Sequence, residues 1–297
     1  FSNGREVAER ARERFAGGTL VPRDQRWSES VEATHEALRD PTCSVIYQGA
    51  FERDGVRVRA EILERIEADS WHILEVKSTV RTRGFHFDDL ALQCWVIEAS
   101  EHLELERMSI VTLNRDYVFD GKTLELDHLL RLHDATEGLT ERIETISHLT
   151  RDLITVIENP EAPVAQTGSQ CNKPRPCEFH AHCTGHTVPA DYPLTLIPNL
   201  DQRTKRALEA QGINDVRNIP EKTKLDALQK RVLESIKTDS PIGSPKLQSI
   251  LEKITYPIHH IDFESFMIAI PRFPNTKPYE GILFQWSNHI EASDGTI

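Results

Sequence analysis

The residues whose types and spacing suggest chemistry lie in the stretch WHILEVKSTV. Glu75 and Lys77 stand two positions apart, so on a β-strand both side chains project from the same face. Ile73 shares that face, whereas Leu74 and Val76 lie on the opposite, buried face. Because a half-buried charged pair needs a physical reason, this stretch is a candidate functional strand.

A second acidic residue, Glu61 in VRAEIL, is expected on the neighbouring strand. Glu61 and Glu75 together would hold Mg or Mn through carboxylate oxygens, with positions left for water and a phosphate oxygen. Lys77 beside them would orient or help deprotonate that water and stabilise transition-state charge. This chemistry is metal-dependent phosphodiester hydrolysis. The alternative interpretation is a solvated Glu–Lys pair on a strand edge with no catalytic role.

These side chains are positioned by elements that the hydrophobic pattern predicts. A surface helix is expected over 1–15, and three strands follow at 44–51, 56–66 and 71–78 as an antiparallel meander. A helix is expected over HFDDLALQCWVIEAS, a buried strand over RMSIVTLN, a short hairpin about Asp120 and Gly121, and an amphipathic helix over 139–158. The order predicts a compact α/β or α+β domain.

Changes in composition along the chain predict three regions. Residues 1–190 form the first, including a cysteine loop at 171–183. A small helical region follows over 191–255, with two short helices around Gly212, and a strand-rich unit occupies 256–297. Whether Arg203, Lys205 and Arg206 in the helical region meet a phosphate, or the helices are only a spacer, stays open at this point.

Five cysteines are an odd number, and three of them crowd into one short segment. Cys171, Cys177 and Cys183 lie in a Pro-containing loop, which is unlike free cysteines of a packed core. Their clustering predicts a metal site. Zinc is one option, with a fourth ligand from His180, His182 or His186, and an iron–sulfur cluster is the other. Cys94 is expected in the core, whereas Cys43 is a possible fourth cluster ligand.

The composition sets limits on the class of protein. No apolar run among the 297 residues approaches the length of a membrane-spanning helix, and the opening FSNGREVAERARERF has no signal-peptide core. We expect a cytoplasmic globular protein with a trimmed N-terminus. The net charge of −12 argues against a generally basic nucleic-acid coat, but it leaves room for a local basic groove.

The combination AEIL, WHILEVKS and HFDDLALQCW resembles the RecB-like branch of the PD-(D/E)XK nuclease superfamily, which has a restriction-endonuclease-like fold. That resemblance implies that Glu61 and Glu75 bind the metal, that Lys77 is catalytic, and that Gln93 contacts substrate or lysine. Glu61 stands where the family usually has Asp. The first helix of this branch often supplies a metal ligand, and here only Glu6 or Glu9 is available.

The resemblance also bears on the cysteines. Related RecB-like nucleases carry a [4Fe-4S] cluster on three C-terminal cysteines and one upstream cysteine. It therefore implies that Cys171, Cys177 and Cys183 hold such a cluster, with zinc as the alternative. The fourth thiolate would come from an upstream cysteine or from Cys43.

Downstream segments carry further resemblances. LTLIPNLDQRTKRALEAQGINDVRNIPE resembles a helix–hairpin–helix unit, and HHIDFESF, with Asp262 and Glu264, resembles the first motif of DEDD-type exonucleases with an RNase H-like fold. The whole order is similar to the bacterial family called domain of unknown function 2779.

These observations lead to one main functional hypothesis and two alternatives. The main hypothesis is a Mg- or Mn-dependent nuclease that hydrolyses DNA, single-stranded DNA included, with a structural iron–sulfur cluster. The first alternative is a nucleic-acid-binding module that retains the fold but has little or no catalysis. The second is a redox- or metal-responsive interaction protein.

Overall fold

The computed structural model describes residues 2–100, 103–165, 167–172, 175–185, 190–244 and 246–297. The chain divides into two compact units. Residues 1–163 and 262–287 form the first unit, and residues 164–261 and 288–297 form the second. Each unit is described by itself.

The first unit is built on a mixed six-stranded sheet in the order β1 to β6. The predicted meander is confirmed: β2, β3 and β4 pair antiparallel in sequence. β5 then pairs parallel to β4 and β6 antiparallel to β5. The strands are β1 (Thr19–Leu20), β2 (Val45–Arg53), β3 (Val56–Arg65), β4 (Ser70–Val76), β5 (Glu104–Leu113) and β6 (Leu130–Asp134).

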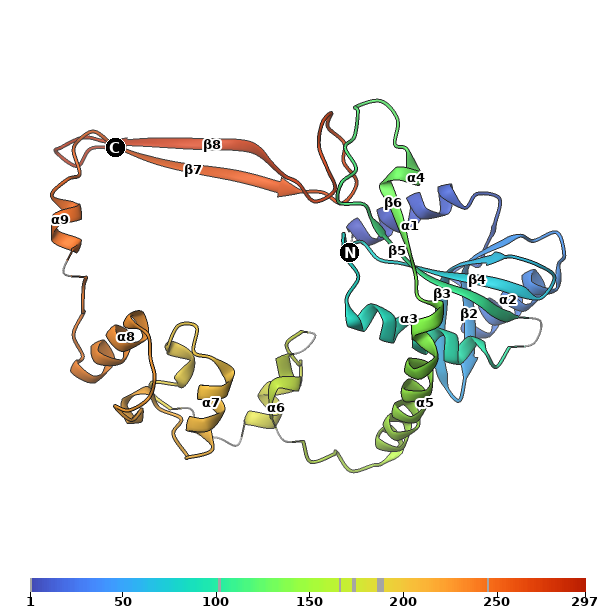
Figure 1. The fold of residues 1–297 in the computed structure, drawn as a ribbon, viewed down its shortest axis with the longest axis horizontal. Helices are drawn as coiled ribbons and strands as arrows, with labels where there is room; N and C mark the ends of the chain where they lie inside the picture. Colours follow the sequence, from blue (N-terminus) through green and yellow to red (C-terminus); the bar gives the residue numbers. More distant parts are fainter. Residues whose placement is uncertain (1, 101–102, 166, 173–174, 186–189, 245) are drawn as a thin grey trace. The chain divides into compact units, whose positions relative to one another are not determined.

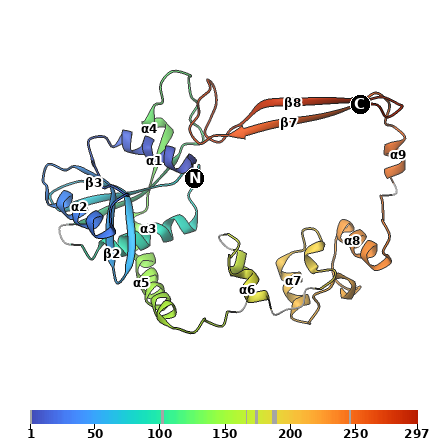
Figure 2. The same cartoon turned by 180° about the vertical axis from the view of Figure 1, so that it is seen from behind.

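Helices cover both faces of this sheet, so the unit is an α/β structure. In Figure 1, α1 (Ser2–Arg14) and α4 (Leu126–Leu129) lie above the strands, and α3 (Gly84–Ile97) and α5 (Thr136–Glu158) lie below them. Figure 2 shows the same elements from behind. α2 (Trp27–Arg39) packs on β2. The parallel pair β4 and β5 needs a crossover connection, which α3 provides.

The alternation of β4 divides its side chains between two hydrophobic cores. Trp71 and Ile73 enter the core shared with α3, and Leu74 enters the core on the α1 face. All three are fully buried, and each such burial stabilises the fold by roughly 1.5–3 kcal/mol. By the same alternation, Glu75 lies on the α3 face.

Two features of the first unit differ from expectation. The hairpin predicted about Asp120 and Gly121 is wrong, because no strand forms there. Instead, Phe119 exchanges backbone hydrogen bonds with a distant segment: its N–H donates to Thr276 O at 3.0 Å, and its carbonyl accepts from Asn275 N at 2.7 Å. A local turn pattern cannot reveal such a remote partner. In addition, α2 was not predicted.

The second unit contains short helices around a small core. That core buries Leu194, Ile197, Leu208, Val216 and Ile219. Its helices are α6 (His180–Thr184), α7 (Gln202–Glu209), α8 (Ala227–Thr238) and α9 (Leu247–Leu251), with 3-10 turns at Ser169–Asn172, Leu194–Leu196 and Val216–Asn218.

The strand-rich C-terminal region forms a separate two-stranded sheet of β7 (Ile258–Met267) and β8 (Gly281–Glu291). The connection between them returns to the first unit, where Ala269 and Ile270 are buried in the core on the α1 face. Within the described residues, no helix is long and apolar enough to cross a membrane.

Candidate active site at the end of strand β4

The charged pair of β4 is joined to α3 by a short hydrogen-bond network. Lys77 Nζ donates to Glu75 Oε1 at 2.7 Å and also to Asp89 Oδ2. Gln93 Nε2 donates to the other oxygen of Glu75, Oε2, at 2.9 Å. Asp89 and Gln93 stand four residues apart, which puts them on one face of α3. The structure therefore brings together Glu75, Lys77 and Gln93.

Lys77 follows directly after β4 and is held by the neighbouring strand. Its backbone N–H donates to Val111 O of β5 at 2.8 Å. The backbone position of the lysine is thus fixed by the sheet, and its side chain is fixed by two carboxylates. Only 19 % of the Lys77 side chain is exposed, compared with 44 % for Asp89, so the network opens to solvent on the Asp89 side.

Burial and charge shift the two ionisable groups of the pair. Burial raises the pKa of Glu75, and nearby Asp89 adds to the increase, while Lys77 and Gln93 oppose it. For Lys77, burial lowers the pKa, but the charges of Glu75 and Asp89 and their hydrogen bonds outweigh burial and raise it. Lys77 is therefore an ammonium, which donates hydrogen bonds and supplies positive charge.

One polar atom of this network lacks a partner. Among the described residues, Gln93 Oε1 is buried and accepts no hydrogen bond. Such an orphaned acceptor has a free-energy cost of about 1–3 kcal/mol unless another group donates to it. A water molecule or a substrate hydroxyl at this position would satisfy it.

Glu61 lies close to this site along the sheet but has a different partner. Ile62 and Leu74 are the last registered pair of β3 and β4, so Glu61 and Glu75 are the next residues at the same end. Arg12 Nη2 of α1 donates to Glu61 Oε1 at 3.1 Å. Arg12 Nε is also buried without a hydrogen-bond partner in the part of the chain that the structure describes.

Strand β3 is irregular at Glu61. Ala60 and Leu63 both pack into the α3-face core, although strict alternation would put residues three apart on opposite faces. The alternation is interrupted at Glu61. Opposite it, Gln48 of β2 has a φ of +58°, a conformation that non-glycine residues adopt at bulges and turns.

The two glutamates proposed on the first helix are not part of the network. Glu6 Oε1 accepts from Arg272 Nη2 at 3.0 Å, and Glu9 is exposed. In the described part of the chain, the side-chain partners of Glu75 and Lys77 are each other, Asp89 and Gln93.

Two residues of the site were missed by the sequence analysis. Asp89 stands one helical turn before Gln93, and that spacing is the signal that identifies it. His86, one turn earlier on α3, is 3 % exposed. Burial lowers the pKa of His86, and the charge of Lys77 contributes to the decrease.

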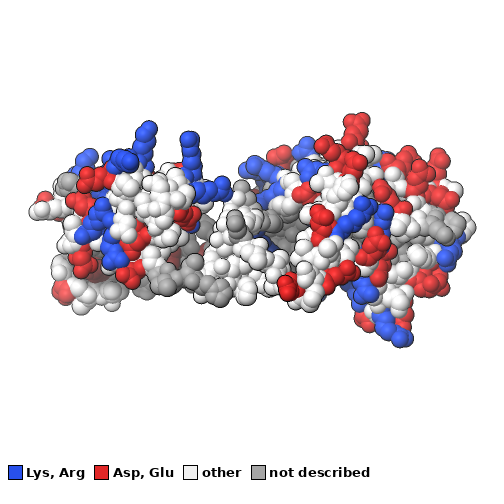
Figure 3. All heavy atoms as spheres, turned by 90° about the horizontal axis from the view of Figure 1, so that it is seen from below, with Lys and Arg blue, Asp and Glu red and all other residues white. Residues whose placement is uncertain are grey.

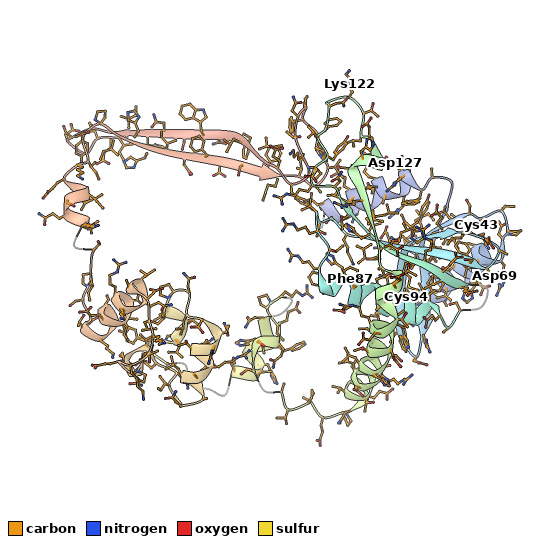
Figure 4. All side chains as sticks on the ribbon, in the orientation of Figure 1. Cys43, Asp69, Phe87, Cys94, Lys122 and Asp127 are labelled. Atoms are coloured by element: carbon orange, nitrogen blue, oxygen red, sulfur yellow. The ribbon has the colours of Figure 1, made fainter. Side chains whose placement is uncertain are left out.

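The cysteines fall into two environments. Cys43 and Cys94, labelled in Figure 4, are buried in the first unit, so the expectation that Cys94 belongs to the core is confirmed. Burial raises the pKa of the Cys94 thiol. The Cys43 thiol lies 3.4 Å from Val45 O and 3.5 Å from Thr19 Oγ1.

The clustered cysteines lie in the second unit and are at least partly exposed: Cys171, Cys177 and Cys183. Cys177 N–H donates to Cys171 O at 2.7 Å, and Gly168 N–H lies 3.4 Å from Cys171 Sγ. The thiols are suitable donors for a soft metal. Of the candidate histidine ligands, His180 and His182 lie on α6, and His186 lies outside the described residues.

A metal site requires several donor side chains gathered around one point. Over the described ranges, no group of three or more His, Cys, Asp or Glu side chains is gathered as a metal site. The chemistry of Glu61 and Glu75 still suits a hard divalent cation. A bound cation would lower the raised pKa of Glu75.

A family model matches the C-terminal part of the chain. The model of the family described as "Domain of unknown function (DUF2779)" matches residues 259–297. This range covers β7 from its second residue onwards, β8 and their connection, but not β4 or the cysteine segment. No curated protein and no solved structure matches the chain.

Proposed function

We propose that this protein is a metal-dependent nuclease that hydrolyses DNA phosphodiester bonds on a RecB-like PD-(D/E)XK core. The observation that carries the proposal is the network of Glu75, Lys77 and Gln93 at one end of a mixed sheet. A carboxylate, an ammonium and an amide are held there by β4 and the crossover helix α3. Support also comes from the nearly buried state of Glu75, which is 9 % exposed.

The roles of the residues follow from their charges and partners. Mg or Mn held by Glu75 and Glu61 would supply Lewis-acid stabilisation of charge on the phosphate. Lys77, kept protonated by two carboxylates, donates to a phosphate oxygen or to the attacking water. Gln93 Oε1, which has no hydrogen-bond partner among the described residues, accepts from that water and orients it.

Water is the nucleophile in the proposed hydrolysis. The water oxygen forms a bond to phosphorus, and the bond from phosphorus to the leaving sugar oxygen breaks. The water loses its proton to solvent, because the network is open to solvent on the side of Asp89, whose side chain is 44 % exposed.

The test is cleavage of end-labelled single- and double-stranded DNA by the purified protein with Mn or Mg. We expect cleavage by the parent protein and a loss of at least about 100-fold in Glu75→Ala and Lys77→Ala, because each removes transition-state stabilisation. Glu67→Ala is the matched control. Glu67 is an exposed glutamate in the turn between β3 and β4, at the other end of these strands.

Two outcomes would contradict the proposal. Cleavage that persists in Lys77→Ala would show that the β4 network is not catalytic. Cleavage lost equally in Glu67→Ala would show that the loss does not depend on the β4 network.

A [4Fe-4S] cluster on Cys171, Cys177 and Cys183 is part of the same proposal, with zinc as the alternative. It is supported by the donor chemistry and by the backbone hydrogen bond that joins Cys177 to Cys171. Iron, sulfide and zinc content of protein purified without oxygen distinguishes the two metals. Cys94→Ser is the control variant, because that thiol is buried in the first unit.

A second candidate function, a binding module without catalysis, is favoured by one contact. Arg12 already neutralises Glu61, one of the two carboxylates required for the cation. A positively charged side chain at that position competes with a metal ion. Tight DNA binding with no cleavage in Mg or Mn, in both the parent protein and Arg12→Ala, would support this candidate.

A further inference from the structure

A cavity at the end of the sheet where β4 and β5 end carries an excess of positive charge. Its volume is about 700 Å³, and its lining includes four cationic and two acidic side chains: Arg81, Arg115, Arg131, Lys277, Asp116 and Glu280. Across the part of the chain that the structure describes, none of the four cations makes an ion pair. Unpaired arginines that converge on one hollow are suited to phosphate oxygens.

The sheet places this cavity at the same end as Lys77. β4 and β5 run parallel, with Val76 opposite Val111, and both strands end there. β6 runs antiparallel to β5 and begins at that end, with Arg131 opposite Thr112. Arg81 follows Lys77 by four residues.

The remaining wall comes from the segment between β7 and β8, which belongs to the first unit. Tyr279 fixes it: its N–H donates to Ile268 O at 2.8 Å, and its hydroxyl donates to Ser78 O at 2.5 Å. Ser78 follows Lys77 directly. Lys277 lies two residues before Tyr279. The backbone around Lys277 is therefore anchored to the residues that follow β4.

The acidic groups reduce the positive charge only in part. Glu280 Oε2 accepts from Lys277 N–H at 2.8 Å, so that carboxylate is directed towards backbone. Four cations against two carboxylates leave two positive charges, in a chain whose net charge is −12. On the face drawn in Figure 3, acidic and basic side chains are interspersed. The local excess of cations around the cavity therefore differs from the mixed charge of that face.

We propose that this cavity binds the phosphate backbone of a nucleic-acid strand and directs it towards Lys77. The identity of the ligand as a DNA strand rests on the proposed function. The cavity holds backbone phosphates next to the one that is cleaved, and its cations contribute affinity without reading base sequence.

The experiment measures binding without cleavage. A fluorescein-labelled single-stranded DNA oligonucleotide is titrated with the full protein in EDTA at several salt concentrations, and anisotropy gives Kd. The variants are Arg81→Gln, Arg131→Gln, Lys277→Gln and the triple variant. The matched controls are Lys122→Gln, on the exposed loop tip labelled in Figure 4, and Arg151→Gln, exposed on α5.

We expect each single cavity variant to weaken binding roughly 3- to 10-fold. Each removed phosphate contact should also reduce the slope of log Kd against log salt by about 0.7. The triple variant should lose about two units of slope, and the controls should match the parent protein. Because the replaced side chains are exposed, melting temperatures should stay within about 2 °C.

The outcomes separate this proposal from the nuclease proposal. Cavity variants that bind like the parent, or a parent protein that does not bind the oligonucleotide, would overturn the cavity assignment even if DNA is cleaved. If DNA binding depends on the cavity residues but neither the parent protein nor Glu75→Ala cleaves DNA, the cavity proposal stands and the nuclease proposal is rejected. Binding of inorganic phosphate to the cavity, without salt-dependent binding of the DNA oligonucleotide, would assign the cavity to a free anion. That result would contradict the proposal.

Discussion

The Lys77 ammonium forms hydrogen-bonded ion pairs with two carboxylates from different elements, Glu75 of β4 and Asp89 of α3. An ammonium between two buried or half-buried carboxylates stabilises both, and it loses its protonated state less readily than a free lysine. The same contact makes Asp89 a positioning residue: it acts on the site through the charges of its neighbours.

Asp89→Asn should shift the pH dependence of cleavage. The Asp89 charge raises the pKa of Glu75, so its removal lowers that pKa. Glu75 must be ionised to bind a cation, and the acidic limb of the pH–rate profile should therefore move to lower pH. We also expect a decrease in maximal rate of about 10-fold, smaller than for Lys77→Ala, because only one of two lysine partners is lost.

Asp88→Asn provides the matched control for this experiment. Asp88 is adjacent in sequence but pairs with Arg142 of α5 instead of Lys77. Its variant should leave the acidic limb unchanged. An acidic limb that stays fixed or moves to higher pH in Asp89→Asn would contradict the assignment.

Some contacts of the site could be predicted from the sequence and others could not, and the difference has a physical cause. The two-residue spacing in β4 is local, so Glu75 and Lys77 follow from strand periodicity, and the resemblance added Gln93. The partner of Glu61 is Arg12, 49 residues away. Its choice depends on where α1 packs and on the interrupted alternation of β3, neither of which a local pattern encodes.

At the scale of elements, β4 and β5 are joined by a buried side-chain contact as well as by the backbone ladder. His72 Nε2 and Ser109 Oγ lie 2.9 Å apart, and His72 is 2 % exposed. Burial lowers the pKa of His72 to about 4, with a smaller contribution from Arg107, while Asp134 opposes the decrease. The Glu64 carboxylate lies 3.5 Å from His72 Nδ1.

This pKa gives the pair β4–β5 a defined pH dependence of stability. The unfolded chain binds a proton at His72 near pH 6.5, but the folded chain does so only near pH 4. The contribution of neutral His72 to the free energy of unfolding is fully present above about pH 6.5, and it decreases as the pH falls towards 4. The decrease is at most about 3 kcal/mol.

His72→Leu should flatten that part of the pH profile, as measured by urea unfolding between pH 4 and 7. His148→Leu, at an exposed position of α5, should leave the slope unchanged. An unchanged slope in His72→Leu would show that His72 does not titrate as the buried environment predicts.

Helices and strands were predictable where the residues that determine them are close together in the sequence. The meander was predicted because two short turns separate strongly alternating strands. The sequence pair Asp120–Gly121 suggested a hairpin turn. Gly121 does adopt a turn conformation, with a φ of +87°. The actual partners of this loop are residues 275 and 276, so only tertiary structure decides its conformation.

At the scale of the whole molecule, the segment matched by the family model shares a hydrophobic core with the N-terminal part of the chain. Ile270 is 2 % exposed and packs in the core that contains Val7 and Leu74. Residues 262–287 of this segment are thus a structural component of the first unit.

Ile270→Ala should lower the free energy of unfolding of the first unit by about 2–5 kcal/mol, because it leaves a cavity in this core. Leu283→Ala on β8, where the side chain is 65 % exposed, should change it by no more than about 0.5 kcal/mol. Chemical denaturation followed by tryptophan fluorescence measures both. Equal effects of the two variants would mean that the segment does not pack as described.

The bonds that fix this segment also determine when the cavity can form during synthesis. Tyr279 and Ser78 are 201 residues apart, and Arg272 and Glu6 are 266 apart. At about 5–20 residues per second, a ribosome needs about 10–40 s to add 200 residues. The six-stranded sheet and Lys77 therefore leave the ribosome well before Lys277 and Tyr279. The nascent chain holds the complete β4 network before it holds the full cationic wall beside it.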